Sequence, residues 1–227
     1  MRPPWEIGAA QPAMRELAER GALRGRVLDV GCGTGEHTLL AAAAGLDATG
    51  VDRSADALAI AERKVREAGL TARFIQHDAL RLAELDEVFD TALDSLCLHA
   101  LAPADRPRYF DGLRTVLRPG GRLFVLCYSD RHTAAPIPPH RMTRGDLESY
   151  GTGGWAVDSV EATTSLSTVH ADGVASWLAS YTKGRSRSCR PPKRAFAPTE
   201  PAATSTSCAA TRPGSVPTAT TTATAPR

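Results

Sequence analysis

The pattern of apolar and polar positions predicts short strands that alternate with amphipathic helices. The run from Val27 to Val30 is rich in apolar residues, as expected for a buried strand, and it is followed by helical spacing from Thr38 to Ala44. Similar apolar runs are predicted as strands at residues 46–51, 73–77, 88–94 and 122–128. Strands and helices in alternation predict an α/β fold, in which a doubly wound, mostly parallel sheet carries helices on both faces.

The two ends of the chain differ from this pattern. Residues 11–20 read as one amphipathic helix after a proline-rich opening, and residues 143–150 read as another short helix. Two last strands are expected at residues 155–162 and 175–182.

Beyond Thr182, 30 of 45 residues are Ala, Pro, Ser or Thr, so this tail cannot bury enough apolar surface to fold. We therefore expect a folded domain over residues 1–182 and a disordered basic tail over residues 183–227. The tail is either a non-native extension from GC-rich coding sequence or a real linker.

Charge and composition narrow the class of protein. The tail carries about +7, so the formal net charge of +2 leaves about −5 for the rest of the chain. A mildly acidic body without a basic stripe argues against nucleic acid as a partner. We expect no membrane span and no signal peptide, and the five cysteines are too scattered for a zinc site. The sequence thus predicts a soluble, cytoplasmic protein, which we expect to be a monomer without a bound metal.

A glycine-rich turn between the first strand and the next helix is the strongest chemical signal. Gly31, Gly33 and Gly35 alternate with Cys32 and Thr34, and an acid, Asp29, stands two positions before the first glycine. Glycines let the backbone approach a ligand closely, and the following helix directs N–H groups toward it. We take Asp29 and residues 31–35 as candidate cofactor-binding residues.

The spacing of the glycines distinguishes among nucleotide ligands. A dinucleotide fingerprint is G-x-G-x-x-G, but here Glu36 occupies the position of its third glycine. The carboxylates of Glu36 and Asp29 are expected to repel a diphosphate and to tolerate a cationic nucleoside. A P-loop is excluded because no Gly-Lys-[Ser/Thr] follows.

Residues 27–42 resemble motif I of the class I S-adenosylmethionine-dependent methyltransferases, whose pattern is an acid, one residue and then G-x-G-x-G. The proline-rich opening with Trp5 resembles the N-terminal lid of the thiopurine-methyltransferase-like small-molecule enzymes, and the resemblance extends over residues 3–182. It implies S-adenosylmethionine as the cofactor, a seven-stranded Rossmann-like sheet that ends in an antiparallel hairpin, and a lid and helix in residues 1–20.

Further cofactor contacts are expected at the ends of the later strands. Asp52 ends the second strand, where a carboxylate binds a ribose diol in α/β nucleotide folds, and Arg53 follows it. The resemblance implies that Asp78 and Ala79 contact the adenine and that Asp94 and Ser95, in motif II, lie at the cofactor edge. Trp5 is expected to cover the cation with its aromatic face.

His99 is the candidate catalytic residue, either as a general base or as a group that orients the methyl acceptor, because an unperturbed imidazole titrates near pH 6.5. The loop from Ser129 to His140 is the candidate wall of the acceptor pocket. We expect in-line transfer of a methyl group from S-adenosylmethionine to a sulfur, oxygen or nitrogen atom of a small molecule. Two alternatives stay open at this point: a non-catalytic or damaged paralogue that only binds the cofactor, and a less favoured NAD-type oxidoreductase.

Overall fold

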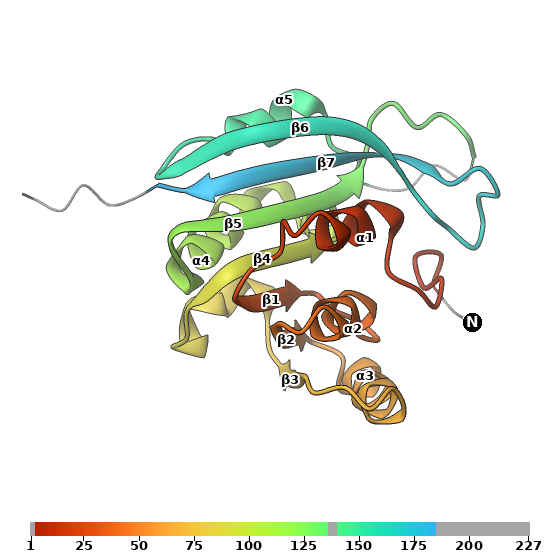
Figure 1. Cartoon of the computed structure of the whole chain (residues 1–227). Helices are drawn as coiled ribbons and strands as arrows, with labels where there is room; N and C mark the ends of the chain where they lie inside the picture. The colour runs from red at the N-terminus through yellow and green to blue at the C-terminus, as the bar shows by residue number, and fades with distance from the viewer. Residues whose placement is uncertain (1–2, 136–139, 185–227) are drawn as a thin grey trace, which may run out of the picture. The chain divides into compact units, whose positions relative to one another are not determined.

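The computed structural model describes residues 3–135 and 140–184. Its central feature is a sheet in which the described residues form seven strands in the order β3-β2-β1-β4-β5-β7-β6 (Figure 1). The predicted disorder of the tail concerns residues that lie, from position 185 onward, outside the described part. The strands are β1 (Arg26–Val30), β2 (Asp47–Asp52), β3 (Arg73–Gln76), β4 (Phe89–Ser95), β5 (Leu117–Tyr128), β6 (Trp155–Ser165) and β7 (Val174–Lys183).

The pairing of the strands confirms the predicted doubly wound sheet with a terminal hairpin. β1 pairs in parallel with both β2 and β4, while β2 pairs with β3 and β4 with β5 in the same sense. β7 runs antiparallel to β5 and β6, and so forms the hairpin. The strand order reverses between β1 and β4, which is where an open α/β sheet has its ligand crevice, outside the carboxyl ends of the strands.

Helices cover both faces of the sheet. Successive strand residues point to opposite sides, so apolar side chains lie on both faces and pack against helices there. On one face, α1 (Pro12–Glu19) and α2 (Glu36–Ala43) pack against Val27 and Phe124, and α3 (Ala55–Glu67) contacts α2, β2 and β3. On the other face lie the 3-10 helix η1 (Ala79–Leu85), α4 (Arg106–Val116) and α5 (Arg144–Ser149). Two short 3-10 turns, η2 (Leu98–Ala100) and η3 (Pro103–Asp105), precede α4.

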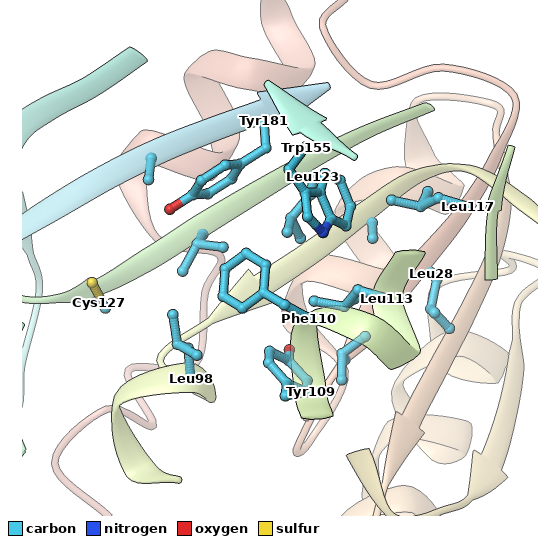
Figure 2. Close-up of a cluster of buried hydrophobic side chains, with 14 of the residues drawn as sticks. Leu28, Leu98, Tyr109, Phe110, Leu113, Leu117, Leu123, Cys127, Trp155 and Tyr181 are labelled. Carbon is cyan, nitrogen blue, oxygen red and sulfur yellow. The ribbon is translucent and has the colours of Figure 1, made fainter. Parts of the chain in front are cut away.

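An aromatic cluster fixes α4 beneath the hairpin. Phe110 stacks on Tyr150 with ring centroids 4.1 Å apart, and it meets Tyr181 and Trp155 edge-on at 5.5 and 6.1 Å. Figure 2 shows Tyr109, Phe110 and Tyr181 within this cluster of buried side chains. These contacts hold α4 against Tyr150, at the end of α5, and against β6 and β7.

Two boundaries differ from those expected. β5 begins at Leu117, before the Arg-Pro-Gly-Gly turn, because Leu117 pairs with Phe89 ahead of a register shift. The connection from β3 to β4 contains η1, which has no clear periodicity in the sequence. Among the described residues, the helices are too short or too polar to cross a membrane.

Candidate active site

The glycine turn forms a cradle between β1 and α2. The N–H groups of Gly31 and Cys32 both donate to the carbonyl of Val51, at 2.8 and 3.0 Å, so the turn is tied to the neighbouring strand β2. Gly33 has φ +53°, and a Cβ built there would meet no atom within 4 Å, because this position faces open space. Gly35, with φ +88°, is the N-cap of α2 and packs against Ala61. The cradle is thus held against β2 at Gly31 and Cys32, and it is open to a ligand at Gly33.

The open side of the cradle forms one wall of a cavity of about 270 Å³. The cavity brings together eight of the residues singled out in the sequence, from five separate segments of the chain. These are Trp5, Gly31, Cys32, Gly33, Thr34, Asp52, Ser95 and His99. A second hollow of about 660 Å³ shares Trp5, Gly33, Thr34 and Asp52 with it and extends toward α3.

The charges around the cavity fit a cation. Glu6, Glu36 and Asp52 contribute carboxylates, and none of the described residues that line the cavity is a lysine or an arginine. His37 and His99 also line it, and burial lowers the pKa of each imidazole to about 4, so both are neutral at pH 7. A nucleoside that carries a sulfonium and an ammonium group suits this lining, whereas a diphosphate would face three carboxylates.

Asp52 links the end of β2 to the cradle. Its carboxylate accepts the N–H of Gly33 at 2.9 Å and the N–H of Ser54 at 2.8 Å. Ser54 caps α3 by accepting the N–H of Ala57. A carboxylate has about four acceptor sites. Asp52 therefore still has acceptor capacity for two hydroxyl donors in the cavity.

The N-terminal segment lies over the carboxyl ends of the strands, near β1 and α2 (Figure 1). Trp5 lines the cavity and is 55% exposed. Beside it, Glu6 accepts the hydroxyl of Thr34 at 2.7 Å. Lys64 of α3 donates to Thr34 at 2.8 Å and to Glu36 at 2.5 Å, and its Nζ lies 3.7 Å from Glu6. The lid segment, defined here as residues 3–11, is thus joined to the cradle through a lysine that the sequence did not single out.

These contacts correct the charge argument drawn from the sequence. The carboxylate of Glu36 is paired with Lys64 and so is not a free negative charge. Asp29 is 1% exposed and accepts the hydroxyl of Thr38 at 2.7 Å, away from the cavity lining. Desolvation raises the pKa of Asp29 to about 7. Lys64 also lies 3.7 Å from Glu6, so one lysine faces two carboxylates, and Asp52 is the lining carboxylate without a lysine or arginine partner among the described residues.

Several predicted residues lie outside the cavity lining and act on the backbone instead. The buried carboxylate of Asp94 accepts the N–H groups of Cys97 and Leu98 and the hydroxyl of Tyr109, the last at 2.6 Å. Asp78 caps η1 by accepting the N–H of Leu80, Ala79 is the first residue of η1, and the carbonyl of Arg53 accepts the side chain of Gln76. The contacts of these residues with an adenosine remain predictions.

His99 lines the cavity from η2. The side chain is 7% exposed, its ring centroid is 4.6 Å from that of Tyr128, and its Nδ1 has no hydrogen-bond partner among the described residues. A neutral imidazole with a pKa near 4 is a poor proton acceptor. This geometry favours the orienting role of His99 over the role of general base. Residues 136–139 of the candidate acceptor loop lie outside the described part.

Three residues at or beside the cavity, Glu6, Gln11 and Lys64, were not predicted from the sequence as site residues. Gln11 is 2% exposed, its backbone N–H donates to His37, and its side chain exchanges two hydrogen bonds with the backbone of Leu166. Glu6 and Lys64 are ordinary surface-type residues in their own segments. No local pattern marks them, because their role depends on three distant segments meeting.

Comparisons with known proteins identify the family of this chain. A family model described as a methyltransferase domain matches residues 27–121. A 2-heptyl-1-hydroxyquinolin-4(1H)-one methyltransferase of Mycobacteroides abscessus is 32% identical over 161 residues, which cover 70% of this chain and 71% of that protein. A probable thiol methyltransferase 2 of Arabidopsis thaliana is 29% identical, over 64% of this chain and 65% of the relative.

Solved structures show the same fold. One described as "Conversion of a Disulfide Bond into a Thioacetal Group during Echinomycin Biosynthesis" has a TM-score of 0.74 and 31% identity, and the match covers 82% of this chain and 86% of that chain. TehB from Haemophilus influenzae has a TM-score of 0.65 at 17% identity, over 80% of this chain and 64% of that one, which is a likeness of fold alone. The chain belongs to the class I S-adenosylmethionine-dependent methyltransferases, and its cofactor is S-adenosylmethionine.

Proposed function

We propose that this methyltransferase acts on a small-molecule acceptor and that the 270 Å³ cavity holds the cofactor with its methyl group directed toward His99. The observation that carries this proposal is the cavity itself, which joins an open glycine cradle, a strand-end carboxylate and an aromatic lid. The relatives named above, a quinolone methyltransferase and a thiol methyltransferase, support an oxygen or sulfur atom as the acceptor.

Each residue has a definite part in this proposal. Asp52 accepts the ribose hydroxyls, and Gly33 leaves space for the ligand beside the backbone. Trp5 places an aromatic face at the cavity, where it attracts a sulfonium. Asp78 and Ala79 are proposed for the adenine, and Ser95 lines the cavity at the end of β4. Gly31, Cys32, Thr34 and Gly35 shape the cradle, whereas Asp29 and Asp94 hold its surroundings in place.

The cofactor supplies an electrophilic methyl group on a sulfonium and a neutral thioether as the leaving group. The protein therefore needs mainly to hold the donor and the acceptor in line at attack distance and to exclude water. Positioning of this kind can contribute roughly 7–11 kcal/mol to catalysis. His99, as a neutral imidazole, orients the acceptor and does not deprotonate it.

The test is calorimetric titration of the protein with S-adenosylhomocysteine and, separately, with NADH. We expect binding of S-adenosylhomocysteine alone. A screen of thiols, phenols, carboxylates and amines with S-adenosylmethionine, read by release of S-adenosylhomocysteine, then defines the acceptor. Binding without turnover of any acceptor would support a non-catalytic paralogue, and preferential binding of NADH would contradict the cofactor assignment.

A further inference from the structure

His37 contacts the lid segment through one nitrogen atom of its ring. It is the second residue of α2, directly after the glycine cradle, and it lines the cavity. Its Nε2 accepts the backbone N–H of Gln11, with 3.1 Å between the two nitrogen atoms. A backbone N–H group can only donate, so Nε2 carries no proton. The ring of His37 is therefore neutral and holds its proton on Nδ1, because one nitrogen of a neutral imidazole is a donor and the other is an acceptor.

The Nδ1–H group of His37 is left available to a ligand. Nδ1 has no hydrogen-bond partner among the described residues. The side chain is half-buried, and Nδ1 is not one of the enclosed side-chain atoms that lack a partner. Ser95 Oγ and His99 Nδ1 line the same cavity, but both atoms are enclosed by their neighbours. His37 thus provides an accessible donor, in a fixed tautomer, at the cavity wall.

Other donors around the cavity are already used within the protein. The hydroxyl of Thr34 donates to the carboxylate of Glu6 in the lid segment. The N–H of Gly33 donates to Asp52. The side-chain amide of Gln11 donates to a backbone carbonyl of the loop between β6 and β7. These groups bind one another, whereas Nδ1 of His37 binds none of the described residues.

The cofactor has one group that the charges of the cavity do not suit. The ribose hydroxyls, the sulfonium and the ammonium of S-adenosylmethionine all fit a lining that carries carboxylates. The α-carboxylate does not, since Glu6, Glu36 and Asp52 are negative and no lysine or arginine occurs among the described lining residues. A buried carboxylate needs hydrogen-bond donors. A neutral histidine supplies such a donor without adding a positive charge that would repel the sulfonium.

We propose that the Nδ1–H of His37 donates to the α-carboxylate of the bound cofactor, so that His37 selects the amino-acid end of S-adenosylmethionine. This inference rests on the proposed function, which places the cofactor in this cavity. Gln11 is then a positioning residue, because its backbone N–H holds the ring in the tautomer that can donate. Gln11 is itself fixed by two hydrogen bonds between its side chain and the backbone of Leu166.

The first experiment compares two ligands by calorimetric titration. One is S-adenosylhomocysteine, and the other is its decarboxylated analogue, which lacks only the α-carboxylate. We expect the wild type to bind S-adenosylhomocysteine roughly ten-fold or more tightly than the analogue, because hydrogen bonds to a charged group are strong. Equal affinity for the two ligands would overturn the inference. Failure of S-adenosylhomocysteine to bind at all would instead contradict the proposed function.

Three variants of His37 separate recognition of the carboxylate from support of the lid segment. His37→Asn puts an amide group near the position of Nδ1, His37→Gln puts one near Nε2, and His37→Phe removes both. The readout is the ratio of the two affinities, which cancels any general loosening of the cavity. We expect the Asn variant to keep part of the preference for S-adenosylhomocysteine, and the Gln and Phe variants to lose it.

Two results with these variants would overturn the proposal. If the Gln variant kept the preference and the Asn variant lost it, His37 would act through Nε2 on the lid segment alone. If all three variants kept the wild-type ratio, another group would bind the carboxylate. Arg15→Gln, an exposed change on α1, is the control and should keep the wild-type ratio.

Nitrogen NMR of the wild type observes the tautomer directly, so the proposal stays testable even where a variant does not fold. The protein is labelled with ¹⁵N and ¹³C, and the ring of His37 is assigned through its scalar couplings. We expect a protonated Nδ1 and an unprotonated Nε2 in the free protein. The Nδ1–H resonance should shift on addition of S-adenosylhomocysteine and less with the decarboxylated analogue. A proton on Nε2, or equal shifts with both ligands, would overturn the proposal.

Discussion

The backbone N–H of Gly33 lies 2.9 Å from a carboxylate oxygen of Asp52 and donates a hydrogen bond to it. This bond connects the tip of the glycine cradle to the end of the neighbouring strand β2. The same two residues face the cavity, so one carboxylate both fixes the cradle and remains available to a ligand. Loss of Asp52 should therefore damage the site in two ways.

Asp52→Ala is expected to weaken binding of S-adenosylhomocysteine by about ten- to a hundred-fold. The variant strands the ribose hydroxyls and the N–H of Gly33, and hydrogen bonds to a charged group contribute about 1.5–3 kcal/mol each. Calorimetric titration measures the change. Asp56→Asn, in the exposed first turn of α3, is the control and should bind normally. An unchanged Kd in Asp52→Ala would remove the ribose assignment.

Gly33→Ala tests whether the cradle faces the ligand. The substitution strains a residue with φ +53° and places a methyl group in open space at the cavity. Gly45→Ala is a matched control, because Gly45 has φ +77° and similarly open surroundings but does not line the cavity. Both variants should lose about 1–2 kcal/mol of stability in urea denaturation. Only Gly33→Ala should also weaken cofactor binding; equal losses of affinity would contradict the assignment.

Lys64→Met tests the connection between the lid segment and the cradle. Its Nζ bonds to Thr34 and Glu36 and lies 3.7 Å from Glu6, and the side chain is 27% exposed. We expect the loss of about 1–2 kcal/mol of cofactor affinity, seen mainly as faster dissociation of S-adenosylhomocysteine in stopped-flow chase experiments. The salt dependence of the dissociation rate should decrease as well.

The control for this variant is Arg66→Met on the same helix, where Arg66 forms an ion pair with the exposed Glu62. It should leave the dissociation rate unchanged. Lys64→Arg should restore much of the wild-type behaviour, because it keeps the charge. An off-rate in Lys64→Met equal to that of the wild type would show that the lid segment is held by other contacts.

Asp29→Asn should change how stability depends on pH. Desolvation raises the pKa of Asp29 in the fold to about 7, above its reference value of 3.8. The native state therefore holds this proton more tightly, so the contribution to stability is complete below pH 4 and is lost as the pH rises to about 7. The wild type should lose a few kcal/mol across this window relative to Asp29→Asn.

Urea denaturation at several pH values between 4 and 8 measures this difference. Asp94, whose pKa is raised to about 6 mainly by desolvation, acts in the same direction in both proteins and cancels. Asp172→Asn, at an exposed position, should follow the wild type throughout. Parallel curves for Asp29→Asn and the wild type would mean that Asp29 is ionised in the fold.

The sequence predicted those parts of the fold and the site that depend on local pattern. The strand, glycine turn and helix at residues 26–43 were recognisable because strand periodicity changes to helical periodicity at glycines that need positive φ. The place of Asp52 at the end of the second strand was predicted as well, and its contact with the ribose stays a prediction. The sheet order confirmed the alternation of strands and helices, including the terminal hairpin.

Features that depend on distant contacts could not be predicted in this way. The pairing of Lys64 with Glu36 requires α3 to lie beside α2, and the charge argument from Glu36 failed for that reason. The burial of Arg106 was equally invisible, because an arginine before a proline in a polar segment reads as a surface residue. The lowered pKa of His99 follows first from its burial and then from the charge of Arg106, and neither cause can be read from its own segment.

The lid segment is also anchored by the loop that joins β6 to β7. The N–H of Thr168 donates to the carbonyl of Pro4 at 2.9 Å, and Gln11 bonds to Leu166, so the loop between β6 and β7 holds both ends of residues 4–11. Under the proposed function, in which the lid segment covers the cofactor, binding of the cofactor and order in that hairpin loop stabilise each other. We therefore expect substitutions at the tip of the hairpin to change how long the enzyme keeps its cofactor, while every residue of the binding cavity stays the same.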